Sequence, residues 1–311
     1  MSAPRHIAVL MGGWSAERPV SLTSGAAVAA ALREAGFTVS EIDVSRDPTA
    51  LIAALTPKPD AVFNALHGTG GEDGTVQALL DLLQIPYTHS GVLASALAMS
   101  KPVAKKLFAA EGLRVPGGTL FAKADVLAGD VMPRPYVVKP PAEGSSFGVQ
   151  IVRPGDNGPA IAEWGFGDSV LVEPYIAGRE LTVAVMDDAA TGQPRALGAI
   201  EIVHAHGFFD YEAKYKGGEA EHIMPPNVPG VVLDELYDMA VRAHQVLGCR
   251  GVSRSDFRYD DTQGSPGTVW LLETNTQPGM TPTSLVPDAA RSQGISFVEL
   301  VTIMVEQARW G

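Results

Sequence analysis

Three oxygen-bearing side chains, those of Asp256, Glu273 and Asn275, lie in two segments that have the alternating pattern of β-strands. Alternate side chains of a strand share a face, so Arg254 lies beside Asp256 on the first segment, and the other two share a face of the second. If the strands pair, two carboxylates and an amide meet beside a guanidinium. The alternative is a set of cross-strand polar pairs on a solvated sheet. Such oxygens suit Mg²⁺, which keeps positions for water and phosphate, so the pattern predicts a nucleoside triphosphate site.

The composition limits the kinds of partner. With 311 residues the chain is long enough for two or three domains. Its formal charge of −12 argues against a nucleic acid or an anionic membrane as a partner, because both require a basic face. The one cysteine, Cys249, excludes an intrachain disulfide and fits a reducing compartment. The apolar run at residues 7–11 is too short for a signal peptide or a membrane span, so we expect a cytoplasmic protein.

The first hundred residues alternate strand and helix patterns, which predicts a doubly wound parallel sheet in an N-terminal α/β domain, residues 1–98. Buried strands are expected at residues 7–11, 38–44 and 61–64. A helix that Ser21 caps and Gly36 closes is expected after the first strand. Glycine-rich loops around Gly12 and Gly70 follow strands, at the edge where such sheets bind ligands.

Two further units are expected, at residues 99–187 and 188–311. In the second unit, strands at 136–139 and 149–152 flank a glycine loop, a hairpin that can cover phosphates. The third unit carries the cluster around Asp256 and a long polar loop at 206–227. A loop of that length inside a compact domain is typical of a lid.

The ordered series of motifs resembles the ATP-grasp superfamily, and within it the D-alanine–D-alanine ligase family. Any single glycine-rich piece is weak, but the series runs along nearly the whole chain. The resemblance implies an ATP-grasp fold, in which central and C-terminal domains sandwich ATP behind the N-terminal domain. It also implies ATP-dependent joining of two D-alanines through an acyl phosphate for peptidoglycan synthesis, with two Mg²⁺ or Mn²⁺ ions held by Asp256, Glu273 and Asn275. The matching segments are residues 12–21, 67–74, 85–88, 90–92, 138–140, 143–146, 211–215, 273–281 and 284–287.

For the phosphates of ATP, the resemblance implies contacts from lysines and from the glycine loop. Lys101 and Lys139 correspond to phosphate-clamping lysines, and Lys214, in the long loop, would reach the transferred phosphate. Lys139 ends an apolar strand, where a lysine is costly unless it is paired or faces a ligand. Ser145 and Ser146 lie in the glycine loop, whose backbone N–H groups can bind phosphate oxygens, although a simple tight hairpin would use the same glycines.

For the adenosine, the resemblance implies a hinge strand that contains Glu173, Tyr175 and Ile176, with Glu180 at the ribose hydroxyls. The family commonly has a lysine after the hinge glutamate, and this chain has Pro174. A proline supplies neither an N–H group nor a charge, so the adenine contacts stay open at this point.

For the first D-alanine, the resemblance implies that Glu17 holds the ammonium and that His67 helps to orient it. Glu17 also suits a helix start, where the helix dipole favours an acid. A lone histidine is more often structural. Ser145 and Tyr215 correspond to partners that hydrogen-bond with Glu17 and lock the lid over the site.

For the second D-alanine and the chemistry, the resemblance points to the cluster around Arg254 and the segment that follows it. Arg254 would stabilise the acyl phosphate and the tetrahedral intermediate, although an ion pair with a neighbouring carboxylate is the alternative. The Gly279 N–H group suits an oxyanion, because glycine lets the backbone approach closely. Ser284 and Leu285 lie at a helix start that can receive the second carboxylate.

Three other functions were weighed. A sister ligase would take D-lactate or D-serine as second substrate, but Tyr215 favours an amine, since a histidine tends to replace it in depsipeptide-forming ligases. A nucleotide-binding ATP-grasp protein without turnover is disfavoured by the complete catalytic set. A hydride-transferring dinucleotide enzyme is disfavoured because no G-x-G-x-x-G motif follows the first strand. A homodimer is usual in the family.

Overall fold

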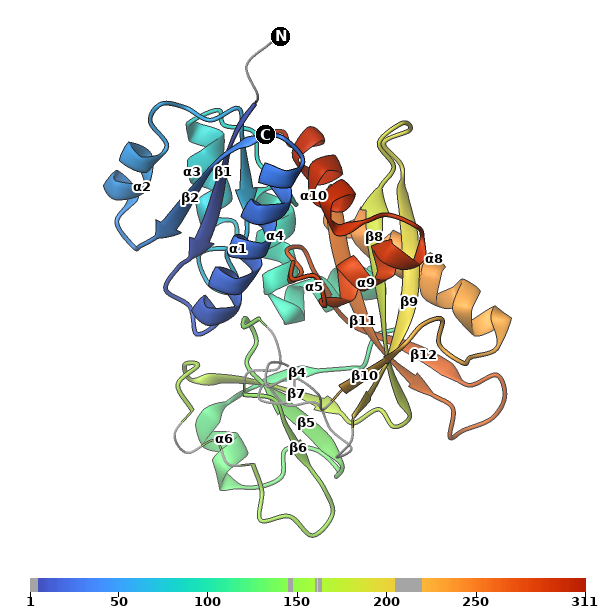
Figure 1. The fold of residues 1–311 in the computed structure, drawn as a ribbon. Helices are drawn as coiled ribbons and strands as arrows, with labels where there is room; N and C mark the ends of the chain where they lie inside the picture. Colours follow the sequence, from blue (N-terminus) through green and yellow to red (C-terminus); the bar gives the residue numbers. More distant parts are fainter. Residues whose placement is uncertain (1–4, 145–147, 160, 162–163, 205–219) are drawn as a thin grey trace.

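The computed structural model describes residues 5–144, 148–159, 161, 164–204 and 220–311 (Figure 1). Four predicted site residues lie outside these ranges: Ser145, Ser146, Lys214 and Tyr215. Within the described ranges, no helix is both long and apolar enough to cross a membrane.

The first sheet is parallel and has the strand order β2-β1-β3. Its elements are β1 (His6–Gly12), α1 (Arg18–Glu34), β2 (Thr38–Val44), α2 (Pro48–Ala54), β3 (Ala61–Asn64), α3 (Thr75–Leu82) and α4 (Val92–Met99). Ile7 and Val9 face a core that contains α1, whereas Ala8 and Leu10 face a second core with α2 and α3. Helices therefore cover both faces, which confirms the predicted doubly wound sheet.

The start of α1 differs from the prediction. The helix begins at Arg18, not after Ser21, because Pro19 fits the first turn, where its fixed φ is helical and its missing N–H group is not needed. Ser21 is buried inside the helix, where its hydroxyl donates to Ala65 O at 2.7 Å and accepts from Gly12 N at 2.9 Å. Ser21 thus ties the helix to two strand ends. The helix closes as expected before Gly36, which has φ 91°.

The second sheet is antiparallel, in the order β4-β7-β5-β6. Its strands are β4 (Thr119–Ala122), β5 (Tyr136–Lys139), β6 (Gln150–Val152) and β7 (Ser169–Pro174), and the helix α6 (Lys123–Ala128) packs on it. Val137 pairs with Glu173 and Lys139 pairs with Leu171. Lys139 and Glu173 are consequently diagonal neighbours on one face.

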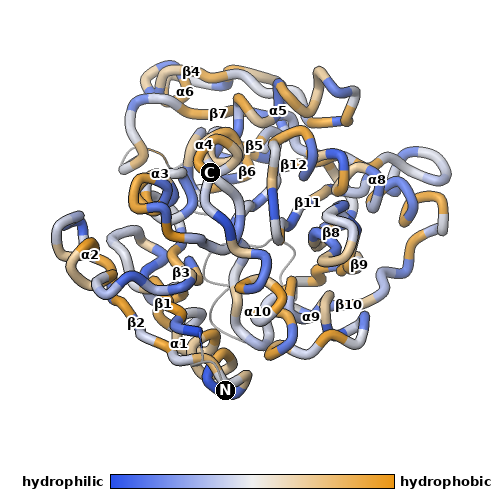
Figure 2. The backbone as a smooth tube through the Cα atoms, turned by 90° about the horizontal axis from the view of Figure 1, so that it is seen from above, coloured by the Kyte–Doolittle hydropathy of each residue, from blue (hydrophilic) through white to orange (hydrophobic). Residues whose placement is uncertain are grey.

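The third sheet has the order β10-β9-β8-β11-β12 and is also antiparallel. Its strands are β8 (Arg179–Asp187), β9 (Pro194–His204), β10 (Ala220–Ile223), β11 (Val252–Asp260) and β12 (Thr268–Asn275). The helices α5 (Lys101–Ala110) and α8 (Gly230–Leu247) pack on one face. The helices α9 (Leu285–Ser292) and α10 (Phe297–Glu306) cover the other face, and α10 lies between α9 and the first unit (Figure 2).

The grouping of strands can be compared with the expected domain boundaries after residues 98 and 187, which remain a prediction. β8 hydrogen-bonds to β9 and β11 in the third sheet, although the expected second unit ends after it. Likewise, Ala104 and Phe108 of α5 are buried in the core of the third sheet. One apolar cluster joins β1 and α1 to β8 and β9, so the first and third units share a core.

The close approach of α1 to β1 yields a stability prediction. A Cβ atom on Gly25 would lie 2.5 Å from Met11 Cβ, which is closer than side chains tolerate. We expect Gly25→Ala to lower the free energy of unfolding by about 1–3 kcal/mol in urea titrations, because overpacking outweighs the better helix propensity of alanine. Gly230→Ala is the matched control, since a Cβ atom there meets nothing within 4 Å. Equal stability of the two variants would contradict this packing.

Candidate active site

The cluster around Asp256 is built by the pairing of β11 with β12. The strands are antiparallel, and Arg254 lies opposite Asn275 while Asp256 lies opposite Glu273. The predicted pairing is therefore confirmed, and it brings two carboxylates, an amide and a guanidinium to one place. A register shift follows directly after Asp256. Bulges of this kind often re-aim side chains near functional sites.

Arg254 binds Asp256 with both arms of its guanidinium. Nε lies 2.8 Å from Oδ1 and Nη2 lies 2.7 Å from Oδ2. Thr182, on the neighbouring strand β8, donates to Oδ1 at 2.6 Å. This bidentate geometry is the strong form of a charge-assisted contact. The ion pair that was the alternative for Arg254 is thus present, and Asp256 is oriented by two strands.

Lys101 neutralises the second carboxylate. Its Nζ lies 2.8 Å from Glu273 Oε2 and donates to Glu143 O at 2.7 Å. Burial by itself would lower the pKa of Lys101, but Glu273, with smaller contributions from Glu173 and Glu72, raises it above the usual value. Lys101 is therefore a buried ammonium that stays charged.

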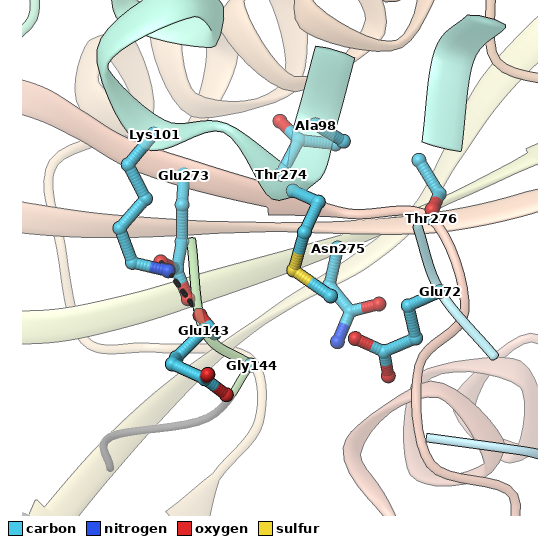
Figure 3. A pocket seen from close by; sticks show the side chains of 10 residues that line it. Glu72, Ala98, Lys101, Glu143, Gly144, Glu273, Thr274, Asn275 and Thr276 are labelled. Carbon is cyan, nitrogen blue, oxygen red and sulfur yellow. Dashed lines mark hydrogen bonds and ion pairs between the residues drawn. The ribbon is translucent and has the colours of Figure 1, made fainter. Parts of the chain in front are cut away.

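A pocket opens beside Lys101, Glu273 and Asn275 (Figure 3). Figure 3 shows Lys101, Glu273 and Glu143 on one side and Glu72 and Asn275 on the other. Carboxylates and one buried ammonium thus surround a polar space that can take a charged ligand. The lining residues are Glu72, Ala98, Met99, Lys101, Glu143, Gly144, Glu273, Thr274, Asn275 and Thr276.

Lys139 and Glu173 belong to a second buried cluster, which also contains Lys105. Lys139 Nζ lies 2.8 Å from Glu173 Oε2, and Lys105 Nζ donates to Oε1 of the same carboxylate. Burial would raise the pKa of Glu173, but Lys139 and Lys105 outweigh it and lower the pKa. The side chain of Glu173, and not only its backbone, is therefore part of the site.

The expected adenosine residues lie where the second sheet passes to the third. Tyr175 N donates to Pro135 O at 3.2 Å, and Ile176 O accepts from Arg258 Nε at 3.2 Å. Arg258 also approaches Glu180, with 3.8 Å between Nη1 and Oε2. Arg258 thus spans the hinge and the expected ribose residue.

Glu17 and His67 meet at the carboxyl edge of the first sheet. Both are buried, and His67 Nδ1 lies 3.1 Å from Glu72 Oε1. A Cβ atom on Gly144 would lie 2.6 Å from Glu17 Oε2 and 3.3 Å from Glu72 Oε2, so Gly144 lies directly against both carboxylates. Glu17 is the N-cap residue of α1, but its side chain makes no capping hydrogen bond.

The electrostatics of His67 favour its charged form. Burial alone would lower its pKa, but Glu72, through a hydrogen bond and its charge, together with Glu17, raises the pKa above the usual value; Arg254 acts in the opposite sense. His67 Nε2 is buried and has no hydrogen-bond partner among the described residues. A buried polar atom of this kind is costly, which fits a position that a ligand completes.

The expected second-substrate residues lie at the start of α9. A Cβ atom on Gly279 would be 3.3 Å from Ser284 Oγ, so the backbone approaches this hydroxyl closely. Ser284 is the N-cap residue, and its Oγ accepts from Thr281 N at 3.1 Å rather than from the helix. Leu285 is the first residue of the helix.

Four residues of the site escaped the sequence analysis. Glu72 stood inside the quoted motif at 67–74, and Glu143 opens the glycine loop, so both could have been found there. Lys105 lies one turn after Lys101, a spacing that places both on one face of a helix. Thr182 carried no signal, because its contact with Asp256 depends on how β8 pairs with β11.

The donor set fits a hard divalent cation. Asp256 and Glu273 offer carboxylate oxygens and Asn275 offers an amide oxygen, the ligand types that Mg²⁺ and Mn²⁺ prefer. Asn275 Oδ1 also accepts from Gln277 N at 2.7 Å, which fixes the orientation of the amide. Over the described part of the chain, no three His, Cys, Asp or Glu side chains form a candidate metal site.

Comparison with known proteins places these features in a family. The family model described as D-ala D-ala ligase C-terminus matches residues 125–306, and the one described as D-ala D-ala ligase N-terminus matches residues 50–90. A D-alanine–D-alanine ligase of Paramagnetospirillum magneticum is 56% identical, over 98% of this chain and 99% of the relative. One of Azorhizobium caulinodans is 53% identical, over 98% of each chain.

Solved structures agree with this placement. A D-alanine–D-alanine ligase from Bacillus anthracis, complexed with ATP, superposes with a TM-score of 0.79 at 31% identity, over 98% of this chain and 97% of that one. The VanG D-Ala:D-Ser ligase from Enterococcus faecalis superposes with a TM-score of 0.79 at 28% identity, over 98% of this chain and 99% of that one. The chain belongs to the D-alanine–D-alanine ligase family and has its ATP-grasp fold.

Proposed function

We propose that this chain joins two D-alanine molecules at the expense of ATP, through an acyl phosphate, to make D-alanyl-D-alanine for peptidoglycan precursors. Relatives with this name are 53–56% identical over nearly the whole chain. The register of β11 on β12 carries the proposal, because it sets Arg254 opposite Asn275 and Asp256 opposite Glu273. Glu273 and Asn275 line one pocket together with Lys101 of α5.

ATP and its metal ions would lie between the second and third sheets. We propose that Asp256, Glu273 and Asn275 hold Mg²⁺ or Mn²⁺, with two ions in the full site. Such ions neutralise phosphate charge and act as Lewis acids when bound. Lys101 and Lys139, both buried ammoniums, would hold the phosphates in this position.

The first D-alanine would lie at the edge of the first sheet. Glu17 would take its ammonium, and the His67 cation would take its carboxylate, with Glu72 orienting the imidazole through Nδ1. The carboxylate of the substrate would then face Arg254, whose charge also acts on His67. Arg254 would then stabilise the negative charge that develops on the acyl phosphate and on the tetrahedral intermediate.

The second D-alanine would enter at the start of α9. Ser284 and the Leu285 N–H group would bind its carboxylate, and its amine would attack the acyl phosphate while the Gly279 N–H group receives the oxyanion. No protein nucleophile is needed, so catalysis rests on positioning and charge neutralisation. Water must be excluded, because an acyl phosphate hydrolyses.

The remaining assignments are proposals of the same kind. Ser145 and Ser146 would cover the phosphates, and Lys214 and Tyr215 would close the lid over the reacting groups; all four lie outside the described residues. At the hinge, Glu173, Tyr175 and Ile176 would meet adenine and Glu180 the ribose. A homodimer and a cytoplasmic location also remain predictions.

A test of the reaction itself is phosphate release from Mg²⁺–ATP. We expect release that depends on D-alanine and not on L-alanine, with D-serine and D-lactate much poorer as second substrates from pH 6 to 9. The D-alanine–D-alanine ligases that are 53–56% identical to this chain support D-alanine as the second substrate. Preference for D-lactate or D-serine would instead establish a sister ligase, and ATP binding without release would indicate a binding protein.

The ion pair of Arg254 with Asp256 yields a second test. We expect Arg254→Ala and Asp256→Asn each to lower kcat by about two orders of magnitude or more, the loss typical of one oxyanion-type contact. Asp234→Asn, at an exposed position on α8, is the control. Thermal unfolding of each variant separates a lost fold from lost chemistry. Near-normal turnover in both site variants would break the assignment.

The pairing of Glu72 with His67 yields a pH test. Glu72 raises the pKa of His67 against the effect of burial, so Glu72→Gln should lower that pKa. Binding of the D-alanine carboxylate to the imidazolium should then be lost at a lower pH than in the unsubstituted protein. NMR titration of the His67 ring, assigned with His67→Gln, measures the shift. Glu34→Gln, at an exposed position on α1, is the control and should leave the pKa of His67 unchanged. An unmoved His67 titration in Glu72→Gln would contradict the proposed pair.

A further inference from the structure

The buried cluster of Lys105, Glu173 and Lys139 connects three parts of the fold. Lys105 comes from α5, Glu173 from β7 and Lys139 from the end of β5, and all three residues are at most 7% exposed. The Glu173 carboxylate contacts both lysines, Lys105 through one oxygen and Lys139 through the other. No role was expected for Lys105 from the sequence.

The helix α5 gives Lys105 a fixed origin. Ala104 and Phe108, its neighbours on the helix, are buried in the core of the third sheet. From there the Lys105 side chain reaches across to β7 of the second sheet. The contact with Glu173 therefore fixes the expected adenine strand relative to the sheet that carries Asp256 and Glu273.

The charges of the cluster do not balance. Two ammoniums share one carboxylate, so the fully ionised cluster has a surplus of one positive charge. The adjacent pair, Lys101 with Glu273, is neutral and does not remove it. Unbalanced buried charge is costly, and a nearby anion relieves the cost. A polyphosphate beside Lys101 and Lys139 is an anion of this kind.

The protonation of Lys105 responds to the groups that face it. Burial, followed by the charge of Lys139 on β5, lowers the pKa of Lys105 to about 7, against the opposing effects of Glu173 on β7 and Glu273 on β12. Lys101, one turn earlier on the same helix, is the other ammonium of this face. The surplus charge therefore exists below neutral pH and disappears above it.

We propose that Lys105 is a positioning residue of the nucleotide site. It anchors the Glu173 carboxylate to α5, and this carboxylate in turn holds Lys139. Lys105 also supplies the surplus positive charge that an anionic nucleotide neutralises. The inference rests on the proposed function in that ATP occupies the space beside Lys101 and Lys139. A bound polyphosphate stabilises the charged form of Lys105, so binding takes up a proton. Nucleotide affinity consequently falls as the pH rises through neutrality.

The test compares equilibrium binding of Mg²⁺–ADP at pH 6.5 and 8.5 by calorimetry in Lys105→Met, Lys105→Arg and the unsubstituted protein. At pH 6.5, Lys105→Met should weaken binding by about tenfold or more, the usual effect of losing a hydrogen bond to a charged group. The unsubstituted protein should bind more weakly at pH 8.5, and Lys105→Met should lack this dependence. Lys105→Arg should keep its affinity at pH 8.5, because a guanidinium stays charged.

Lys106→Met is the matched control, because Lys106 is the exposed neighbour of Lys105 on the same helix. It should bind Mg²⁺–ADP as the unsubstituted protein does at both pH values. In turnover assays, Lys105→Met should raise the KM for ATP while the KM for D-alanine stays within about twofold, as expected for a residue that acts on nucleotide binding alone.

Two results would overturn the proposal: unchanged Mg²⁺–ADP affinity in Lys105→Met, or a pH dependence that the substitution leaves intact. If Lys105→Met fails to unfold cooperatively, Lys105→Arg serves as the deciding variant. The proposal is overturned if the Mg²⁺–ADP affinity of Lys105→Arg falls between pH 6.5 and 8.5 as much as that of the unsubstituted protein. The variants could bind Mg²⁺–ADP as expected although the protein shows no D-alanine-dependent phosphate release. That result would support the positioning role of Lys105 and refute only the proposed reaction.

Discussion

The site depends on one register, that of β11 against β12. A slip by one residue would turn Asp256 to the opposite face and separate it from Glu273. The register is held from the other face, where the buried hydroxyls of Ser255 and Thr274 lie 2.9 Å apart. Thus contacts on one face of the sheet set the positions of the ligand-binding side chains on the other face.

Around this register the largely buried charges are arranged in compensating pairs. Asp256 is neutralised by Arg254, and Glu273 by Lys101. Breaking a buried pair is strongly destabilising, since it leaves one charge uncompensated. A phosphate or a metal ion that enters must therefore displace one member of a pair and neutralise the charge of the other member in its place. The preformed pairs are consistent with a site that exchanges internal counter-ions for those of its ligands.

Local sequence patterns predicted much of the fold and of the candidate site. Most of the features that were not predicted depend on pairing between segments far apart in the sequence. The alternation in β11 and β12, the glycine loops and the order of strands and helices in the first unit are properties of short segments. The sheet to which β8 belongs is not, because its pairing with β11, as of Ala184 with Arg254, joins segments far apart in the sequence. The side-chain role of Glu173 was missed for the same reason, since Lys105 is 68 residues away in sequence. The start of α1 was a local error, in which a plausible serine cap was preferred to the proline turn before it.

The three units are joined in two physically different ways. The first and third share an apolar core, and Asn64 at the end of β3 donates to Gln277 Oε1, after β12, at 2.7 Å. The second sheet has an apolar core of its own and meets the others through polar contacts, such as Arg258 Nη2 to Gly178 O at 2.6 Å and Lys101 N to Pro141 O at 3.0 Å. An apolar core fixes the amino-acid edge relative to the metal-type donors, because its packing is lost if the units shift. Polar contacts, by contrast, can be exchanged for those of a ligand at little net cost.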